Sequence, residues 1–84
     1  MTLSASFVVC GIDVSKDRLD VALGGMRTEK WQVPNTPQGQ TMLAKDLAKK
    51  GVSLVVMEAT GGYEAAGACT LQALELATAV INPR

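Results

Sequence analysis

The fold depends on the stretch FVVCGIDV at residues 7–14, which is short, apolar and rich in β-branched side chains. Such a run is typical of a strand buried in a sheet, and here it meets a carboxylate, Asp13, near its C-terminal end. A second run, SLVVME at residues 53–58, closes on another carboxylate, Glu58. The two runs predict two buried strands, each with an acid near its end.

Three further strands are predicted from the alternation of apolar and polar side chains. Residues 19–23 place three apolar side chains on one face, and residues 28–33 alternate in a similar way before Pro34. Because proline cannot donate to a sheet ladder, the strand before Pro34 is expected at a sheet edge. A short fifth strand is expected at residues 78–81.

Two helices complete the pattern. The first begins at Thr36-Pro37, a capping hydroxyl followed by proline, and ends before Gly51. The second is expected from residue 63 to about residue 76 and is rich in small residues. The order β-β-β-α-β-α-β predicts an α/β fold with a mixed sheet, in which a crossover lets the fourth strand run parallel to the first.

Composition excludes several classes of protein. The 84 residues suffice for one small domain, and a hydrophobic content of 48% is too high for a disordered tail. Eight basic and eight acidic residues leave no net charge, so bulk electrostatics give no sign of nucleic-acid or membrane binding. The absence of histidine excludes His-dependent triads and zinc-finger spacing. Without a long apolar run or a basic leader, a cytoplasmic protein with no membrane segment is expected.

The sulfur-containing residues are expected to be structural. Cys10 and Cys69 both sit in apolar runs, which predicts two free, buried thiols in a reducing compartment. Met42 and Met57 are expected in the core.

Asp13 and Glu58 are the main chemical signal. If their strands are parallel neighbours, the two acids leave the same edge of the sheet on strands ~4.8 Å apart. Carboxylates are ligands that Mg²⁺ prefers, and paired divalent ions promote phosphodiester chemistry. The alternative is that both acids are solvated side chains at loop ends. Spacing alone does not decide between these interpretations.

Three blocks of the sequence share their order and spacing with one protein family. The blocks are FVVCGIDVSKDRLDVAL at residues 7–23, VVMEATGGYE at residues 55–64 and VINPR at residues 80–84. They resemble the insertion-sequence-110 (Piv-type) transposases, also called DEDD transposases. The resemblance implies a ribonuclease-H-like (RuvC-like) fold. It also implies that Asp13 and Glu58 are the first and second catalytic acids and ligands of Mg²⁺ or Mn²⁺.

The resemblance implies partners as well. Members of the family are recombinases that mobilise DNA elements, and at least some are guided by a structured RNA. Their third and fourth acids and a serine nucleophile lie downstream of the last block. Residues 1–84 are therefore expected to be the N-terminal part of a RuvC-like domain, truncated after strand five and inactive alone. The loss of a covering helix is expected to expose apolar surface, which predicts a homo-oligomer, most simply a two-fold dimer.

Four residues are weaker candidates for nucleic-acid contact. Lys16 follows the first acid by three positions, although a solvated turn lysine has the same pattern. Tyr63 is suited either to stack on a base or to pack its helix on the sheet. Asn82 and Arg84 follow the fifth strand and are expected near the acids.

Two other functions stay open. Residues 11–23 slightly resemble the first phosphate loop of the sugar-kinase and actin-like ATPase superfamily, although Val14-Ser15-Lys16 lacks the glycine typical of that loop. A non-catalytic nucleic-acid-binding or protein-binding module is the third hypothesis.

The transposases commonly have a glycine between the second helix and the fifth strand. No glycine follows Gly67 here, which leaves the helix end undefined.

Overall fold

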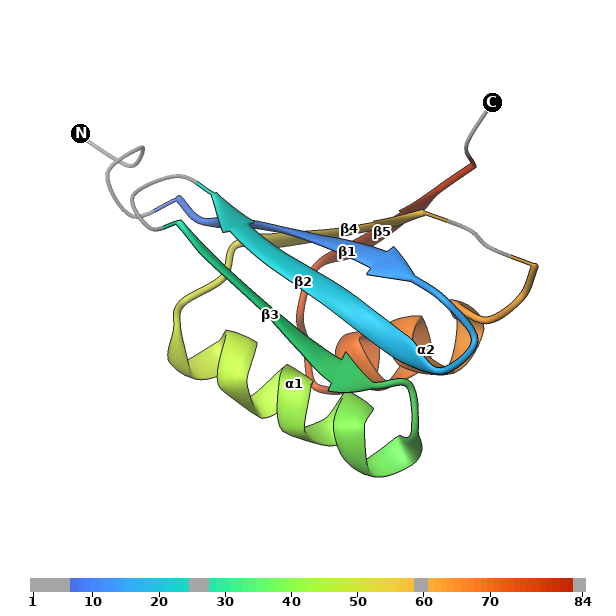
Figure 1. Ribbon diagram of the computed structural model, residues 1–84. Coiled ribbons are helices and arrows are strands. Elements are labelled where there is room, and N and C mark those ends of the chain that lie inside the picture. Colours follow the sequence, from blue (N-terminus) through green and yellow to red (C-terminus); the bar gives the residue numbers. More distant parts are fainter. Residues whose placement is uncertain (1–6, 25–27, 59–60, 83–84) are drawn as a thin grey trace.

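Five strands and two helices make up the computed structural model, which describes residues 7–24, 28–58 and 61–82 (Figure 1). The strands are β1 (Val9–Val14), β2 (Arg18–Gly24), β3 (Glu29–Pro34), β4 (Leu54–Glu58) and β5 (Thr78–Ile81). Helix α1 (Pro37–Lys49) joins β3 to β4, and helix α2 (Ala65–Ala73) joins β4 to β5. The observed order confirms the predicted α/β fold.

The strands form one mixed sheet in the order β3-β2-β1-β4-β5. Strand β1 lies at its centre, antiparallel to β2 and parallel to β4. Strands β2 and β3 are antiparallel, whereas β4 and β5 are parallel. The crossover between the first and fourth strands is therefore confirmed. Strand β3, which ends at Pro34, lies at an edge as expected.

One face of the sheet carries the hydrophobic core, and both helices pack on that face (Figure 1). Alternation along the strands brings their apolar side chains to it, and they are buried: Cys10, Ile12, Val14, Leu19, Val21, Leu23, Val33, Val55 and Met57. The helices contribute the buried side chains Leu43, Ala44, Leu47, Ala68 and Leu71. No described helix covers the opposite face, which is called the open face below. In the described residues no helix is long and apolar enough to cross a membrane.

Helix α1 begins as its sequence predicts. The hydroxyl of Thr36 accepts a hydrogen bond from the amide of Gly39 at 3.1 Å, and Pro37 occupies the first turn. A Cβ atom at residue 39 would collide with the carbonyl oxygen of Pro34. Glycine therefore permits the first turn of α1 to lie against the end of β3.

Both helices end in the same hydrogen-bond pattern, with one residue in the left-handed conformation. After α1 that residue is Gly51 at φ 69°, and Val52 donates back to the carbonyl of Leu47. After α2 it is Glu75 at φ 66°, and Leu76 donates back to the carbonyl of Leu71. This is the Schellman arrangement, which usually takes glycine at the left-handed position.

The second helix is shorter than predicted. It runs over Ala65–Ala73, whereas the sequence suggested residue 63 to about residue 76. Residues 61–64 form turns, because Gly61 and Gly62 adopt positive φ angles that a helix cannot continue. At the other end the helix stops at Ala73, and Glu75, two positions later, takes the left-handed conformation that a glycine usually provides.

Two of the four predictions about sulfur-containing residues are wrong. Cys10 and Met57 are buried in the core, as expected. Cys69 is exposed, and Met42 is 63% exposed. An apolar run within a helix turns side chains to every side. Those that face away from the sheet therefore lie in solvent.

Candidate functional site

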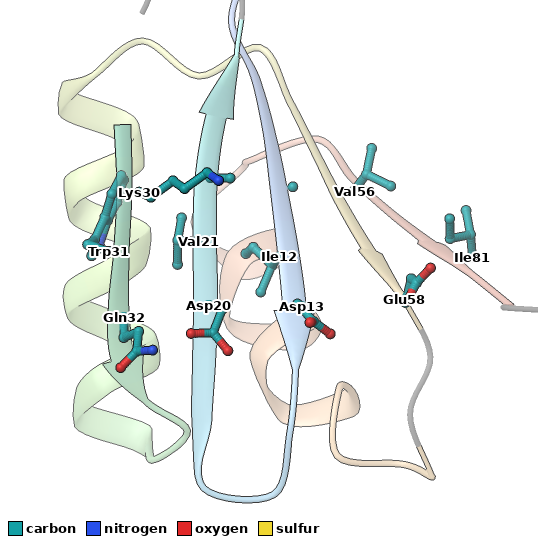
Figure 2. Close-up of a pocket in the computed structure, with 12 residues that line it drawn as sticks. Ile12, Asp13, Asp20, Val21, Lys30, Trp31, Gln32, Val56, Glu58 and Ile81 are labelled. Atoms are coloured by element: carbon teal, nitrogen blue, oxygen red, sulfur yellow. The ribbon is translucent and has the colours of Figure 1, made fainter. Parts of the chain in front are cut away.

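A basin of about 670 Å³ lies on the open face of the sheet (Figure 2). It is lined by Gly11, Ile12, Asp13, Asp20, Val21, Ala22, Lys30, Trp31, Gln32, Val56, Glu58 and Ile81. All five strands contribute to it, so the sheet itself forms the floor. Because the helices lie on the other face, this floor is accessible from solvent.

Asp13 and Glu58 both line this basin, at the C-terminal ends of β1 and β4. The last residues that pair between these parallel strands are Ile12 and Met57, whose side chains are buried in the core. The next residue on each strand must face the other way, so both acids lie on the open face. Figure 2 shows the Asp13 carboxylate on the side of β1 that faces β4. The structure thus brings the two predicted acids to one basin.

A third acid in the basin was missed from the sequence. Asp20 on β2 is the direct partner of Asp13 across the antiparallel pair, and its side chain is partly exposed. Its Oδ2 lies 3.7 Å from Nε of Arg18. The alternation in residues 19–23 places Asp20 on the polar face of its strand. The register that sets it opposite Asp13 cannot be read from that pattern.

A basic side chain also lines the basin. Lys30 on β3 lines it beyond β2, together with Gln32 from the same strand (Figure 2). The basin therefore has acids over β1, β2 and β4 and a basic side chain at the β3 edge. Alternation along residues 28–33 puts Lys30 and Gln32 on the same face of their strand, but the sequence gives no reason to connect them with the acids.

The four weaker candidates lie outside the basin or outside the described residues. Lys16 is exposed in the turn between β1 and β2. Tyr63 is 46% exposed in the turn before α2. Asn82 is exposed and directly follows Ile81, which lines the basin. Arg84 lies outside the described residues.

The donor set of the basin is suited to a divalent cation held by few protein ligands. Among the described residues no three His, Cys, Asp or Glu side chains are grouped closely enough to hold a metal ion together. Mg²⁺ commonly uses only one or two carboxylates, with waters and substrate phosphates as its other ligands. Asp13 and Glu58, two oxygen donors open to solvent on neighbouring strands, fit that mode of binding.

Comparison with known proteins identifies the family. The chain matches no curated protein. Among solved structures it is similar to the Aquifex aeolicus member of the Ppx/GppA family, with 14% sequence identity and a TM-score of 0.48. That similarity covers 92% of this chain and 35% of the other, so the chain spans about a third of that protein. The family model of the insertion-sequence-110 DEDD proteins, described as Transposase, matches residues 10–84. The chain therefore belongs to the DEDD transposases of the insertion-sequence-110 type.

Proposed function

We propose that this chain carries the first two acids of a transposase catalytic centre, Asp13 and Glu58. The observation that supports this most directly is that both acids leave the C-terminal ends of neighbouring parallel strands and line one basin. The family supplies the reaction class, the cleavage and exchange of DNA strands. Residues 1–84 are then the N-terminal part of a RuvC-like domain.

In this proposal Asp13 and Glu58 hold Mg²⁺ or Mn²⁺ on the open face. A divalent ion bound there would supply Lewis-acid polarisation of a phosphodiester group. The two side chains orient the ion, and their strands supply the rigidity that such a site requires. Because both carboxylates are exposed, phosphate and water have room to complete the coordination.

The proposed partner is DNA, together with a structured guide RNA in the longer protein. The chain is also proposed to form a homo-oligomer and to act in the cytoplasm. The exposed side chains of Lys16, Tyr63 and Asn82 are available for nucleic-acid contact, and Arg84 is a further candidate from the sequence. Lys30 adds a basic group to the same basin. A phosphate backbone that crosses the basin would meet this lysine on one side and the cation-binding acids on the other.

The turn after β1 favours the transposase over a phosphate-loop ATPase. A phosphate loop needs free backbone amides directed at the ligand. Here the amide and the hydroxyl of Ser15 both donate to the carbonyl of Arg18 at 3.0 Å. These two donors of the turn are thus already engaged within the protein.

Titration of residues 1–84 with Mn²⁺ tests the proposal, with free Mn²⁺ measured by its paramagnetic resonance signal. Asp13→Asn and Glu58→Gln are each expected to weaken binding at least about tenfold, because each replaces one of two anionic ligands with a neutral amide. The control is Asp17→Asn, which removes the same charge from an exposed turn residue that does not line the basin. Circular dichroism verifies that each variant folds.

The Mn²⁺ affinities of the three variants decide for or against the proposal. The proposal is supported if Asp17→Asn binds Mn²⁺ with wild-type affinity and both Asp13→Asn and Glu58→Gln bind it more weakly. Unchanged affinity in Asp13→Asn and Glu58→Gln, or an equal loss in all three variants, overturns it.

A further inference from the structure

Asn35, between β3 and α1, joins three other segments of the chain through its side chain. Its Nδ2 donates to the carbonyl oxygen of Ser15 at 3.0 Å and to that of Tyr63 at 3.1 Å. Its Oδ1 accepts from Nε2 of Gln40 at 2.8 Å. In addition, its backbone amide donates to the carbonyl oxygen of Asp17 at 3.0 Å.

The chemistry of these contacts requires an amide. The carbonyl oxygens of Ser15 and Tyr63 can only accept, so two N–H groups must face them. The third partner, Nε2 of Gln40, donates and therefore needs an oxygen. A primary amide offers both donors and the acceptor in one plane. An aspartate of the same shape would keep only the contact with Gln40.

The contact with Gln40 anchors the group to the body of the fold. Gln40 is a buried polar residue of α1, only 5% exposed, and it lies beside α2. A Cβ atom placed on Gly67 of α2 would lie 3.9 Å from Cγ of Gln40. Gln40 is therefore packed close to α2, and its buried amide holds the Oδ1 atom of Asn35.

The two carbonyls belong to the segments that leave the acid-bearing strands. Ser15 lies two positions after Asp13, in the turn that follows β1. Tyr63 lies in the turn between β4 and α2, downstream of Glu58. Pairing between β1 and β4 stops at Ile12 and Met57, one position before the acids. The bridge through Asn35 therefore links the turn after β1 to the turn before α2, beyond the point where the pairing of β1 with β4 ends.

We propose that Asn35 is a positioning residue of the site. It joins the turn after β1 to the turn before α2, and through them it sets the spacing at which Asp13 and Glu58 bind one cation. This inference rests on the proposed function, because it assumes that the two acids bind a cation together.

Two variants of Asn35 test the inference. Asn35→Asp keeps the shape and the acceptor but loses both donated hydrogen bonds, and Asn35→Ala removes all side-chain contacts without adding charge. The control is Ser53→Ala. It removes the hydrogen bond that the hydroxyl of Ser53 accepts from the amide of Val8 at 3.2 Å, at the opposite ends of β1 and β4. Any general loss of stability should affect the control in the same way.

Two measurements are made on residues 1–84. In the absence of metal, nuclear magnetic relaxation gives backbone order parameters for residues 15–17 and 61–64. Both Asn35 variants are expected to lower these values in both turns, whereas Ser53→Ala leaves them unchanged. Both are also expected to weaken Mn²⁺ binding by about tenfold, because the two ligands lose their fixed spacing, with the control within a factor of about two of wild type.

The results distinguish this inference from the function on which it rests. Mn²⁺ binding that does not depend on Asp13 and Glu58 overturns the proposed function, and with it the positioning role. Wild-type binding that does depend on them, together with unchanged affinity or unchanged order parameters in both Asn35 variants, overturns the positioning role alone.

Discussion

Asp13 and Asp20 are direct partners across the antiparallel strands β1 and β2, and both line the basin on the open face. Like charges directly opposite each other on neighbouring strands destabilise a sheet. The guanidinium of Arg18, 3.7 Å from Asp20, offsets only part of this repulsion because the pair is exposed. Residues that lower the local stability of the fold in this way are typical of functional sites.

The first prediction follows from this repulsion. In the presence of a chelator, Asp13→Asn is expected to raise the free energy of unfolding by about 0.2–1 kcal/mol, because it removes one of two facing charges. Urea denaturation measures the change. Asp17→Asn, in the exposed turn, is expected to change stability less. A loss of stability in Asp13→Asn would show that the facing acids do not repel in this way.

The second prediction concerns activity. Residues 1–84 alone are expected to cleave no DNA in the presence of Mg²⁺ or Mn²⁺, because the proposed site offers two acids and reactions that need several residues acting as a unit fail when some are missing. The assay is incubation of the purified chain with labelled branched DNA followed by gel electrophoresis. Metal-dependent cleavage that Asp13→Asn abolishes would contradict this expectation.

The third prediction compares two glycines. Gly39→Ala is expected to destabilise the protein by more than about 2 kcal/mol, because the new Cβ would collide with the backbone of Pro34. Gly11→Ala is the matched control, since a Cβ there meets nothing within 4 Å. It is expected to change stability by no more than about 1 kcal/mol. Thermal unfolding of both variants measures the difference, and equal midpoints would rule out the close approach of α1 to β3.

The fourth prediction concerns the end of α2. Glu75 adopts φ 66°, which costs a residue with a side chain about 1 kcal/mol or more relative to glycine. Glu75→Gly is therefore expected to stabilise the fold by roughly that amount. Glu75→Ala removes the same charge without relieving the strain and is the control. If the two variants are equally stable in urea, the left-handed conformation at this position is not the source of the gain.

The fifth prediction concerns the two thiols. Burial raises the pKa of the Cys10 thiol to about 11, whereas Cys69 is exposed on α2. Because the thiolate is the reactive form, one thiol per chain is expected to react quickly with an aromatic disulfide reagent at neutral pH, and two after unfolding. Cys69→Ser should leave no fast-reacting thiol in the folded chain. Rapid labelling of that variant would contradict the burial of Cys10.

Local sequence patterns predicted the order of the strands and helices, although the second helix is shorter than expected, and they singled out Asp13 and Glu58. The alternation of side chains, the cap at Thr36 and the glycine at residue 51 act within a few residues of chain, so their effects can be read without a structure. The two apolar runs also predicted the parallel pairing of β1 with β4, because a strand that follows a crossover has few other places to go. The placement of Asp13 and Glu58 at one edge of the sheet was predicted in this way.

Only the tertiary structure decided which groups meet. The partnership of Asp13 with Asp20 depends on strand register, and a shift of one residue would send Asp20 to the other face. The hydrogen bonds of Asn35 join turns that are 20 and 28 positions away in the chain. Met42 and Cys69 lie in solvent because of where the helices rest on the sheet. Each of these facts depends on packing between distant segments, and a local pattern carries no information about such packing.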